Sequence, residues 1–199
     1  MRKLLFLLLA LLISVGSQAK KNNNTRLFKG TLSALQDTQA RGFVVIDYSN
    51  TKVEGKPLKQ FLKSEGMTMN DFTKNDSERI RYFREKWNGK MKNGMSLVTQ
   101  ESEATHYVRI RVNKFNYGMS MTGRRTGSTY SLSGVKGGGA SFTGYVDIVP
   151  KGSNTPVCTL EVLEMNGTIM GSTFNGEQGI LRAFNDQAEN ICKLVRKGK

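Results

Sequence analysis

Residues 106–115, HYVRIRVNKF, alternate between apolar and polar side chains. Successive side chains of a strand point to opposite faces, so this alternation predicts a strand with one face on a core and one toward water. The inward set is Val108, Ile110 and Val112, and the outward set is Tyr107, Arg109, Arg111 and Asn113. Segments 141–149 and 157–164 alternate in the same way, and we expect the three strands to form an antiparallel meander.

Two amphipathic helices accompany these strands. The first, near 75–92, places Ile80, Phe83, Trp87 and Met91 on one face, and a basic remainder is expected to be solvated: Arg79, Arg81, Arg84, Lys86, Lys90 and Lys92. The last, 179–197, carries the stripe Ile180, Phe184, Ala188, Ile191 and Val195. A sheet with one apolar face is completed if both helices pack on it. We therefore predict an α+β fold of two layers, with a mostly antiparallel sheet and two helices on one face.

The first 19 residues predict a signal peptide. Arg2 and Lys3 precede an apolar run of about a dozen residues, and a Ser-Gln-Ala cleavage pattern ends at Ala19. The run falls short of the roughly 20 apolar residues that span a bilayer, although an uncleaved anchor is the alternative. We expect an exported chain, periplasmic or secreted, in which residues 20–199 form a single α+β domain.

GFVVIDYSN at 42–50, ATHYVRIRV at 104–112, a glycine-bearing return strand and the terminal amphipathic helix follow one another along the chain. The first of these, apolar on both faces, predicts a central strand covered on both sides. This order resembles small exported α/β proteins of Gram-negative envelopes. It is also similar to the periplasmic domain of the curli secretion channel and to the amino-terminal domain of the translocation protein TolB. The resemblance covers about 40–197 and implies envelope association without catalysis, although many such proteins are lipoproteins and this chain has no lipidation cysteine.

The charge balance is strongly basic, with 30 Lys and Arg against 16 Asp and Glu, a net charge of +14. A basic chain usually suggests nucleic acid, but export argues against that partner. Anionic lipid headgroups, lipopolysaccharide phosphates, acidic glycans or another envelope protein are the partners that we expect. Ordinary solubility charge spread over the surface is the alternative.

Two cysteines follow the leader, Cys158 and Cys192, and both lie at inward positions of their predicted strand and helix. An oxidising compartment permits a disulfide between them. Such a bridge would contribute roughly 3–4 kcal/mol by the chain-entropy model. Two free buried thiols are the alternative.

No constellation in the sequence predicts catalysis. His106 is the only histidine, and one histidine with two separated cysteines supplies no zinc site. No motif indicates a cofactor, so we expect none, and no metal. The remaining enzymatic option is a carboxylate pair of the glycosidase kind. Its candidates are Asp47, Asp147, Glu161 and Glu164, of which Asp47 lies best at the end of a strand. Pairing with arginines on neighbouring strands explains these carboxylates without catalysis.

Residues 118–140 form a long connector with many glycines and no acidic residue. The stretch GVKGGGA has its lysine before the glycines and precedes a strand, so it does not match a phosphate loop. Three interpretations stay open: a flexible connector, a binding ribbon with Arg124 and Arg125 near its tip and Lys136 beside them, or a membrane hairpin.

The sequence thus favours a non-enzymatic cell-envelope protein that binds or scaffolds, with contacts to anionic components through Arg124, Arg125 and Lys136. A hydrolase of acidic glycans acting through Asp47 and a second carboxylate is the first alternative. A subunit of an oligomeric envelope channel is the second.

The leader carries a direct prediction. If signal peptidase cuts after Ala19, the exported protein begins at Lys20. Amino-terminal sequencing of the protein released from the envelope fraction measures this. Membrane-bound protein that retains Met1 would contradict the prediction.

Overall fold

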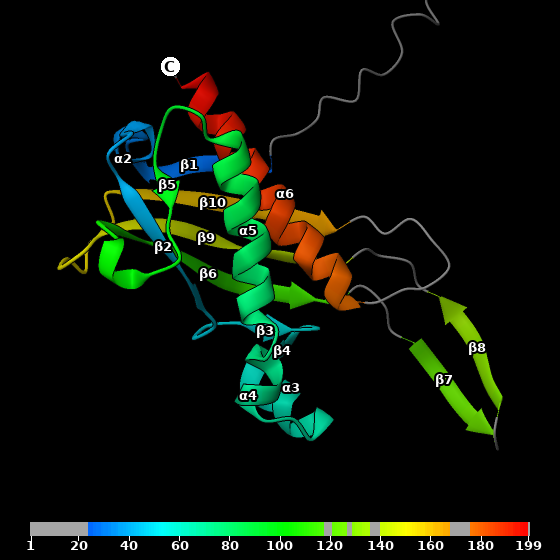
Figure 1. Cartoon of the computed structure of the whole chain (residues 1–199). Coiled ribbons are helices and arrows are strands. Elements are labelled where there is room, and N and C mark those ends of the chain that lie inside the picture. The colour runs from blue at the N-terminus through cyan, green and yellow to red at the C-terminus, as the bar shows by residue number, and fades with distance from the viewer. Residues whose placement is uncertain (1–23, 118–120, 127–128, 136–139, 168–175, 199) are drawn as a thin grey trace, which may run out of the picture.

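The computed structural model describes residues 24–117, 121–126, 129–135, 140–167 and 176–198. Its main sheet has the order β1-β10-β9-β6-β2-β5, and the short strands β3 and β4 extend it beside β6 (Figure 1). The strands are β1 (Thr25–Gly30), β2 (Arg41–Asp47), β3 (Lys52–Val53), β4 (Lys56–Pro57), β5 (Ser96–Leu97), β6 (His106–Asn116), β9 (Ala140–Pro150) and β10 (Cys158–Gly167).

Two long helices, α5 (Asp76–Lys90) and α6 (Gly176–Lys197), cover one face of this sheet. The shorter helices are α2 (Ser33–Gln36), α3 (Leu58–Glu65) and α4 (Met69–Thr73), and a 3-10 turn spans Glu101–Glu103. Figure 1 shows α5 and α6 side by side in front of the strands. The two helices run in the same direction. Arg79 near the start of α5 binds Glu177 near the start of α6, and Lys86 further along α5 binds Glu189 further along α6. The α+β fold class is confirmed.

The prediction of a mostly antiparallel sheet is wrong, because the sheet is mixed. β6, β9 and β10 form the expected antiparallel meander. β2, however, pairs parallel with both β6 and β5. Helices α3, α4 and α5 lie between β2 and β6 in the chain, and a crossover through helices returns the chain in the same direction along the sheet. The antiparallel meander thus continues into a parallel half.

The expectation of a doubly covered β2 is also wrong. β2 is second from the edge of the sheet, with only the two-residue β5 outside it. Val44 is buried beneath the helices, whereas Phe43 and Val45 on the other face are half-buried. Apolar residues on both sides of this strand therefore do not indicate that both of its faces are fully buried.

The core fills the space between the sheet and the two long helices. Phe83 and Trp87 of α5 are fully buried, and the Trp87 Nε1–H donates to the carbonyl of Met95 at 2.7 Å. Phe184 of α6 stacks at a ring-centroid distance of 4.7 Å on Phe142 of β9. The strand positions that face them are fully buried as well: Val108, Ile110, Val146, Ile148 and Leu160. The inward set predicted for β6 is therefore confirmed.

The predicted long connector contains a β-hairpin of its own. β7 (Met121–Thr126) and β8 (Thr129–Val135) pair antiparallel as a separate two-stranded sheet. Thr126 faces Thr129 in the last pair of the ladder, and residues 127–128 between them lie outside the described residues. The ribbon geometry is therefore present, and its role stays a prediction.

Both cysteines are free thiols in the structure, which does not support the predicted disulfide. They are buried as expected, but in different surroundings. The Cys192 Sγ lies 3.8 Å from the carbonyl oxygen of Trp87, and Cys158 pairs in the sheet with Ile148 and Gly30. Burial raises the pKa of Cys158 to about 11 and that of Cys192 to about 12, so both remain protonated near neutral pH.

The signal peptide falls outside the described residues, and its assignment stays a prediction. Within residues 24–198, as far as the structure describes them, no helix combines the length and apolarity needed to cross a membrane.

The link between α5 and α6 predicts a pH dependence. Hydrogen bonds from Lys193 and Lys86 lower the pKa of Glu189 from 4.5 to about 2. A carboxyl group with a lowered pKa stabilises the fold above its unfolded value, and this contribution is lost as pH falls from about 4.5 toward 2. Glu189→Gln should therefore lower the free energy of unfolding by about 0.5–1 kcal/mol at pH 7 and much less at pH 3, as measured by urea unfolding.

Glu65→Gln is the control, because it removes another exposed carboxylate and the same charge. An equal loss at both pH values in Glu189→Gln would contradict the prediction.

Candidate functional site

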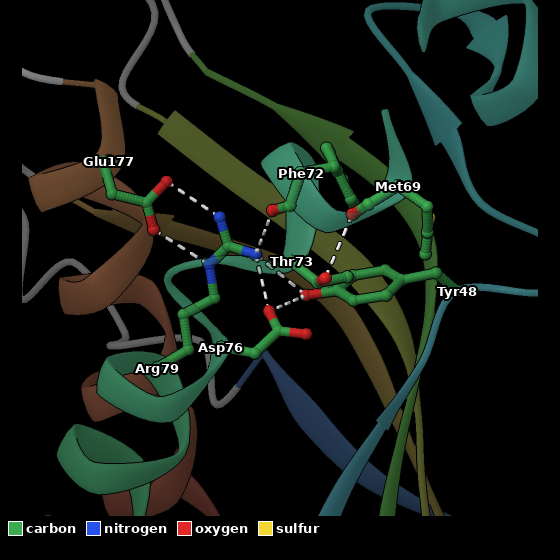
Figure 2. Close-up of polar contacts among 7 residues, drawn as sticks. All are labelled: Tyr48, Met69, Phe72, Thr73, Asp76, Arg79 and Glu177. Atoms are coloured by element: carbon green, nitrogen blue, oxygen red, sulfur yellow. Dashed lines mark hydrogen bonds and ion pairs between the residues drawn. The ribbon is translucent and has the colours of Figure 1, made fainter. Parts of the chain in front are cut away.

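A buried arginine lies where the helical layer meets the end of the sheet. The side chain of Arg79, on the first turn of α5, has an exposed fraction of 0%. It is surrounded by Tyr48 at the end of β2, Phe72 of α4, Asp76 of α5 and Glu177 of α6, and we call these five residues the Arg79 cluster (Figure 2). One side chain thus contacts four different elements.

The guanidinium group of Arg79 has all its nitrogens engaged. Nε and Nη2 donate to the two carboxylate oxygens of Glu177, each at 2.8 Å, which is the bidentate geometry that makes arginine–carboxylate pairs strong. Nη1 donates to Asp76 Oδ1 at 2.7 Å, to the Tyr48 hydroxyl at 3.0 Å and to the carbonyl of Phe72 at 3.4 Å. The Tyr48 hydroxyl in turn donates to Asp76 at 2.7 Å. The donors and acceptors of the cluster therefore satisfy one another.

The electrostatics of the cluster favour a fixed structural role. Burial acts to lower the pKa of Arg79, but the hydrogen bonds and charge of Glu177 outweigh it and raise that pKa above its ordinary value. Burial raises the pKa of Tyr48 and also that of Asp76, against the bonds from Tyr48 and Arg79. Arg79 and Tyr48 therefore do not exchange protons near neutral pH, which argues against acid–base catalysis by these two groups.

The sequence did not indicate this cluster. Arg79 was expected on the solvated face of α5, with Ile80 on the buried stripe. In the structure Arg79, Phe83 and Trp87 are buried at spacings of four, whereas Ile80 is half-buried. The predicted burial of Phe83, Trp87 and Met91 is thus confirmed, and Arg79 occupies the buried position expected of Ile80. The only sign of the cluster in the sequence is Asp76, one helical turn before Arg79. The second carboxylate partner of Arg79, Glu177, is 98 residues away along the chain.

A hollow of about 450 Å³ opens beside Tyr48. We call it the Lys52 hollow; its wall is formed by the loop after β2, by α3 and by one residue of α4. The lining residues are Tyr48, Ser49, Asn50, Thr51, Lys52, Pro57, Leu58, Lys59, Leu62 and Met69. Apolar side chains of α3 and Met69 thus lie beside hydroxyl, amide and ammonium groups, a mixture suited to a ligand with one polar end.

Local sequence explains why this wall is fixed. Glu54 and Gly55 have φ values of 49° and 81°, and they join β3 to β4 as a tight two-residue turn. Thr51 is buried, its hydroxyl donates to the carbonyl of Val112 at 2.6 Å, and its own carbonyl accepts from Leu58 N at 2.9 Å. Pro57 directly precedes Leu58, the first residue of α3. The loop is therefore attached to β6 on one side and α3 on the other.

Two lysines face one another at this end of the sheet. Lys52 of β3 is in register with Lys114 of β6, and both side chains are exposed. Lys59 lines the same hollow as Lys52. Among the residues that the structure describes, none of these three has a carboxylate within ion-pair distance. Like charges directly opposite on paired strands are destabilising, so an anion bound between Lys52 and Lys114 would lower the repulsion between them.

The carboxylates that the sequence singled out have structural partners. Asp147 is buried and forms a bidentate ion pair with Arg111. It also accepts a hydrogen bond from the Thr159 hydroxyl at 2.8 Å. Glu161 pairs with Arg26 at 2.6 Å, and Glu164 is exposed. The pairing of strand carboxylates with arginines is thus confirmed for Asp147 with Arg111, and Glu161 has a different arginine from those expected.

Asp47 lies at the end of β2 and accepts from the backbone N–H of Ser49 at 2.9 Å. Burial acts to raise its pKa, but the Ser49 hydrogen bond and the charges of Arg109 and Arg111 hold that pKa below its ordinary value. A general acid of a glycosidase needs a raised pKa, so Asp47 is poorly suited to that part.

The remaining sequence candidates are not brought into either site. The His106 Nδ1 lies 2.8 Å from the Thr105 hydroxyl. Arg124 and Arg125 lie in β7, opposite Ser131 and Tyr130, and Lys136 lies outside the described residues. Within the described part of the chain, no group of three or more histidine, cysteine, aspartate or glutamate side chains is placed to hold a metal ion.

Comparison with known proteins gives distant likenesses only. No family model and no curated protein matches the sequence. Among solved structures, the chain is similar to the PelC dodecamer from Paraburkholderia phytofirmans, with a TM-score of 0.42, 10% identity, and 83% of this chain and 96% of that chain covered. For a single-residue variant of that dodecamer the TM-score is 0.38 and the identity is 12%, and the match covers 82% of this chain and 94% of that chain. Likenesses of this size establish neither a family nor a function, and the resemblance to the curli and TolB domains stays a prediction.

The Arg79 cluster makes a testable prediction about stability. Arg79→Met removes the guanidinium group from two partly buried carboxylates, and breaking a buried pair from one side costs about 3–5 kcal/mol. Adding Glu177→Gln should recover part of that loss, because it removes one of the two carboxylates that Arg79 stabilises. Urea unfolding of the single and double variants measures both effects.

Arg81→Met is the matched control on the same helix. Arg81 is exposed, pairs at the surface with Glu78 and Glu85 and lies 4.8 Å from the ring centre of Tyr82, so its loss should cost only about 1 kcal/mol. Similar losses at the two positions would show that the Arg79 cluster contributes nothing beyond an ordinary surface pair.

Proposed function

We propose that this protein is an exported, non-catalytic protein of the cell envelope that binds an anionic envelope component at the Lys52 hollow. The observation that carries the proposal is the pair of exposed lysines, Lys52 and Lys114, in register on neighbouring strands without a carboxylate partner in the described chain. Lys52 lines the hollow, and Lys114 lies opposite Lys52 on β6 without being a lining residue itself. An anion between them would remove the repulsion and add two charge-assisted hydrogen bonds.

The residues that line the hollow indicate which kind of anion fits it. Ser49, Asn50 and Lys59 supply further donors, whereas Leu58, Leu62 and the 43% exposed Met69 supply apolar surface next to them. A phosphate or carboxylate group attached to an apolar body fits such a lining better than a free inorganic ion does. Anionic lipids and the lipid-linked phosphates of lipopolysaccharide have this composition, and acidic glycans share only the charge.

Two further observations support binding rather than catalysis. The carboxylates Asp147 and Glu161 are held by arginines, and Asp47 has a lowered pKa, so each is favoured as a charged structural partner. The predicted leader supports export. A hydrolase acting through Asp47 would instead require an activity that Asp47→Asn abolishes while leaving the fold intact.

The proposal predicts a specific loss of binding. Lys52→Gln with Lys114→Gln should weaken binding to phosphatidylglycerol-containing vesicles by about thirtyfold, because each lysine near an anionic surface contributes about 1 kcal/mol. Vesicles of phosphatidylcholine alone, lipopolysaccharide and polygalacturonate, tested in parallel by co-sedimentation, distinguish lipid, phosphate and glycan as the source of the charge. Added salt should weaken binding by the parent protein, because the lysines are exposed.

Lys90→Gln with Lys92→Gln is the control, because it removes the same charge from exposed positions at the other end of α5. Equal weakening by the two double variants would mean that only net charge matters and would overturn the assignment of the hollow. Absence of binding to all four materials by the parent protein would overturn the proposal itself.

A further inference from the structure

β1 is an edge strand with apolar side chains exposed on both of its faces. It pairs with β10 on one side, and the strand order of the sheet ends there. Leu27 is in register with the buried Leu160 and therefore lies on the helix-covered face, yet it is 40% exposed. Phe28 lies on the other face, 5.4 Å from the ring of Tyr145, and is 60% exposed. A neighbouring strand would cover both.

Further apolar residues lie along the same edge. Val157, whose carbonyl accepts from Thr31 N beyond one end of β1, is 41% exposed. Leu163, whose N–H donates to the carbonyl of Asn24 before the other end, is 47% exposed. Four of the five exposed large apolar side chains in the described part of the chain therefore flank this one strand, the fifth being Met69. Such clustering is typical of an interaction surface.

The charges on β1 indicate what kind of strand fits. Arg26 and Lys29 are exposed and there is no acidic residue in the strand. If two copies of β1 paired antiparallel about their centre, Arg26 of one would face Lys29 of the other, which is destabilising. The register shift between Leu27 and Lys29 also works against a regular ladder with a second copy. An acidic strand avoids the like-charge contact, because its carboxylates would face Lys29 and also Arg26, which already pairs with Glu161 at 2.6 Å. The register shift constrains any added strand, so it does not distinguish the two occupants.

We propose that the β1 edge binds an extended segment of another envelope protein in which apolar residues alternate with aspartate or glutamate. The segment adds to the sheet beyond β1 through main-chain hydrogen bonds, its apolar side chains cover Leu27 and Phe28, and its carboxylates face Arg26 and Lys29. This surface is separate from the Lys52 hollow and does not depend on it, because β10, β9 and β6 lie between them in the sheet.

Two synthetic peptides of about ten residues test the proposal, one alternating valine with glutamate and the other valine with lysine. Fluorescence anisotropy with the exported protein should show at least about tenfold tighter binding of the glutamate peptide. Lys29→Glu should weaken that binding about twofold to fivefold, the range of a single cross-strand charge pair. Phe28→Ser should weaken it as well by removing the covered apolar surface. Hydrogen exchange at the amides of residues 25–30 should slow when the glutamate peptide binds.

Lys63→Glu is the matched control for charge reversal and should leave peptide binding unchanged, since the exposed Lys63 lies in α3, beside β3 and β4, with β6, β9 and β10 between them and β1. Equal affinity for the two peptides, or binding without slower exchange in 25–30, would overturn the proposal. Self-association of the protein that Phe28→Ser abolishes in the absence of peptide would identify a second copy as the occupant and would overturn it too.

Discussion

The bidentate pair between Arg79 and Glu177 is the interaction on which the arrangement of the helices depends. It joins the first turn of α5 to the start of α6, and through Asp76 and Tyr48 it joins both to the end of β2. The donors of a guanidinium group have fixed directions, so the carboxylates must lie in one arrangement to bind all of them. The pair therefore sets the relative position of the helices as well as contributing to stability. Tyr48 also lines the Lys52 hollow, so the hydrogen bonds of the Arg79 cluster fix the position of one of the residues that form the hollow.

The sequence was sufficient where a pattern repeats within one element. The alternation of Val108, Ile110 and Val112 predicted β6 and its inward face, and the stripe from Ile180 to Val195 predicted α6. It was insufficient where the deciding partner is distant in the chain. Arg79 resembles its neighbours Arg81 and Arg84 in sequence, and its burial depends on the distant partners Glu177 and Tyr48 as well as on the nearby Asp76. The parallel pairing of β2 with β6 likewise depends on where the crossover helices pack, which the strand pattern of GFVVIDY does not encode.

The charged residues of the sheet fall into two groups that composition does not distinguish. On the outer face Arg111 and Arg26 have carboxylate partners on neighbouring strands, and Asp147 has a hydroxyl partner as well. Near the end of the sheet Lys52 and Lys114 lie opposite one another, and among the described carboxylates none is paired with them. A high net charge therefore says little about where an anion binds, whereas the strand register identifies the place at which charge is left uncompensated.

The strand order has a geometric consequence. β6, β9 and β10 are the longest strands, of 11, 11 and 10 residues, and they form a continuous antiparallel block between β1 and β3. Neighbouring strands lie about 4.8 Å apart, so the four steps from β1 to β3 keep the β1 edge and the Lys52 hollow roughly 19 Å from one another. A packed sheet of this kind bends little. The sheet therefore keeps the two proposed binding sites at a constant separation, so a protein strand bound at one and an anionic surface bound at the other would be held a fixed distance apart.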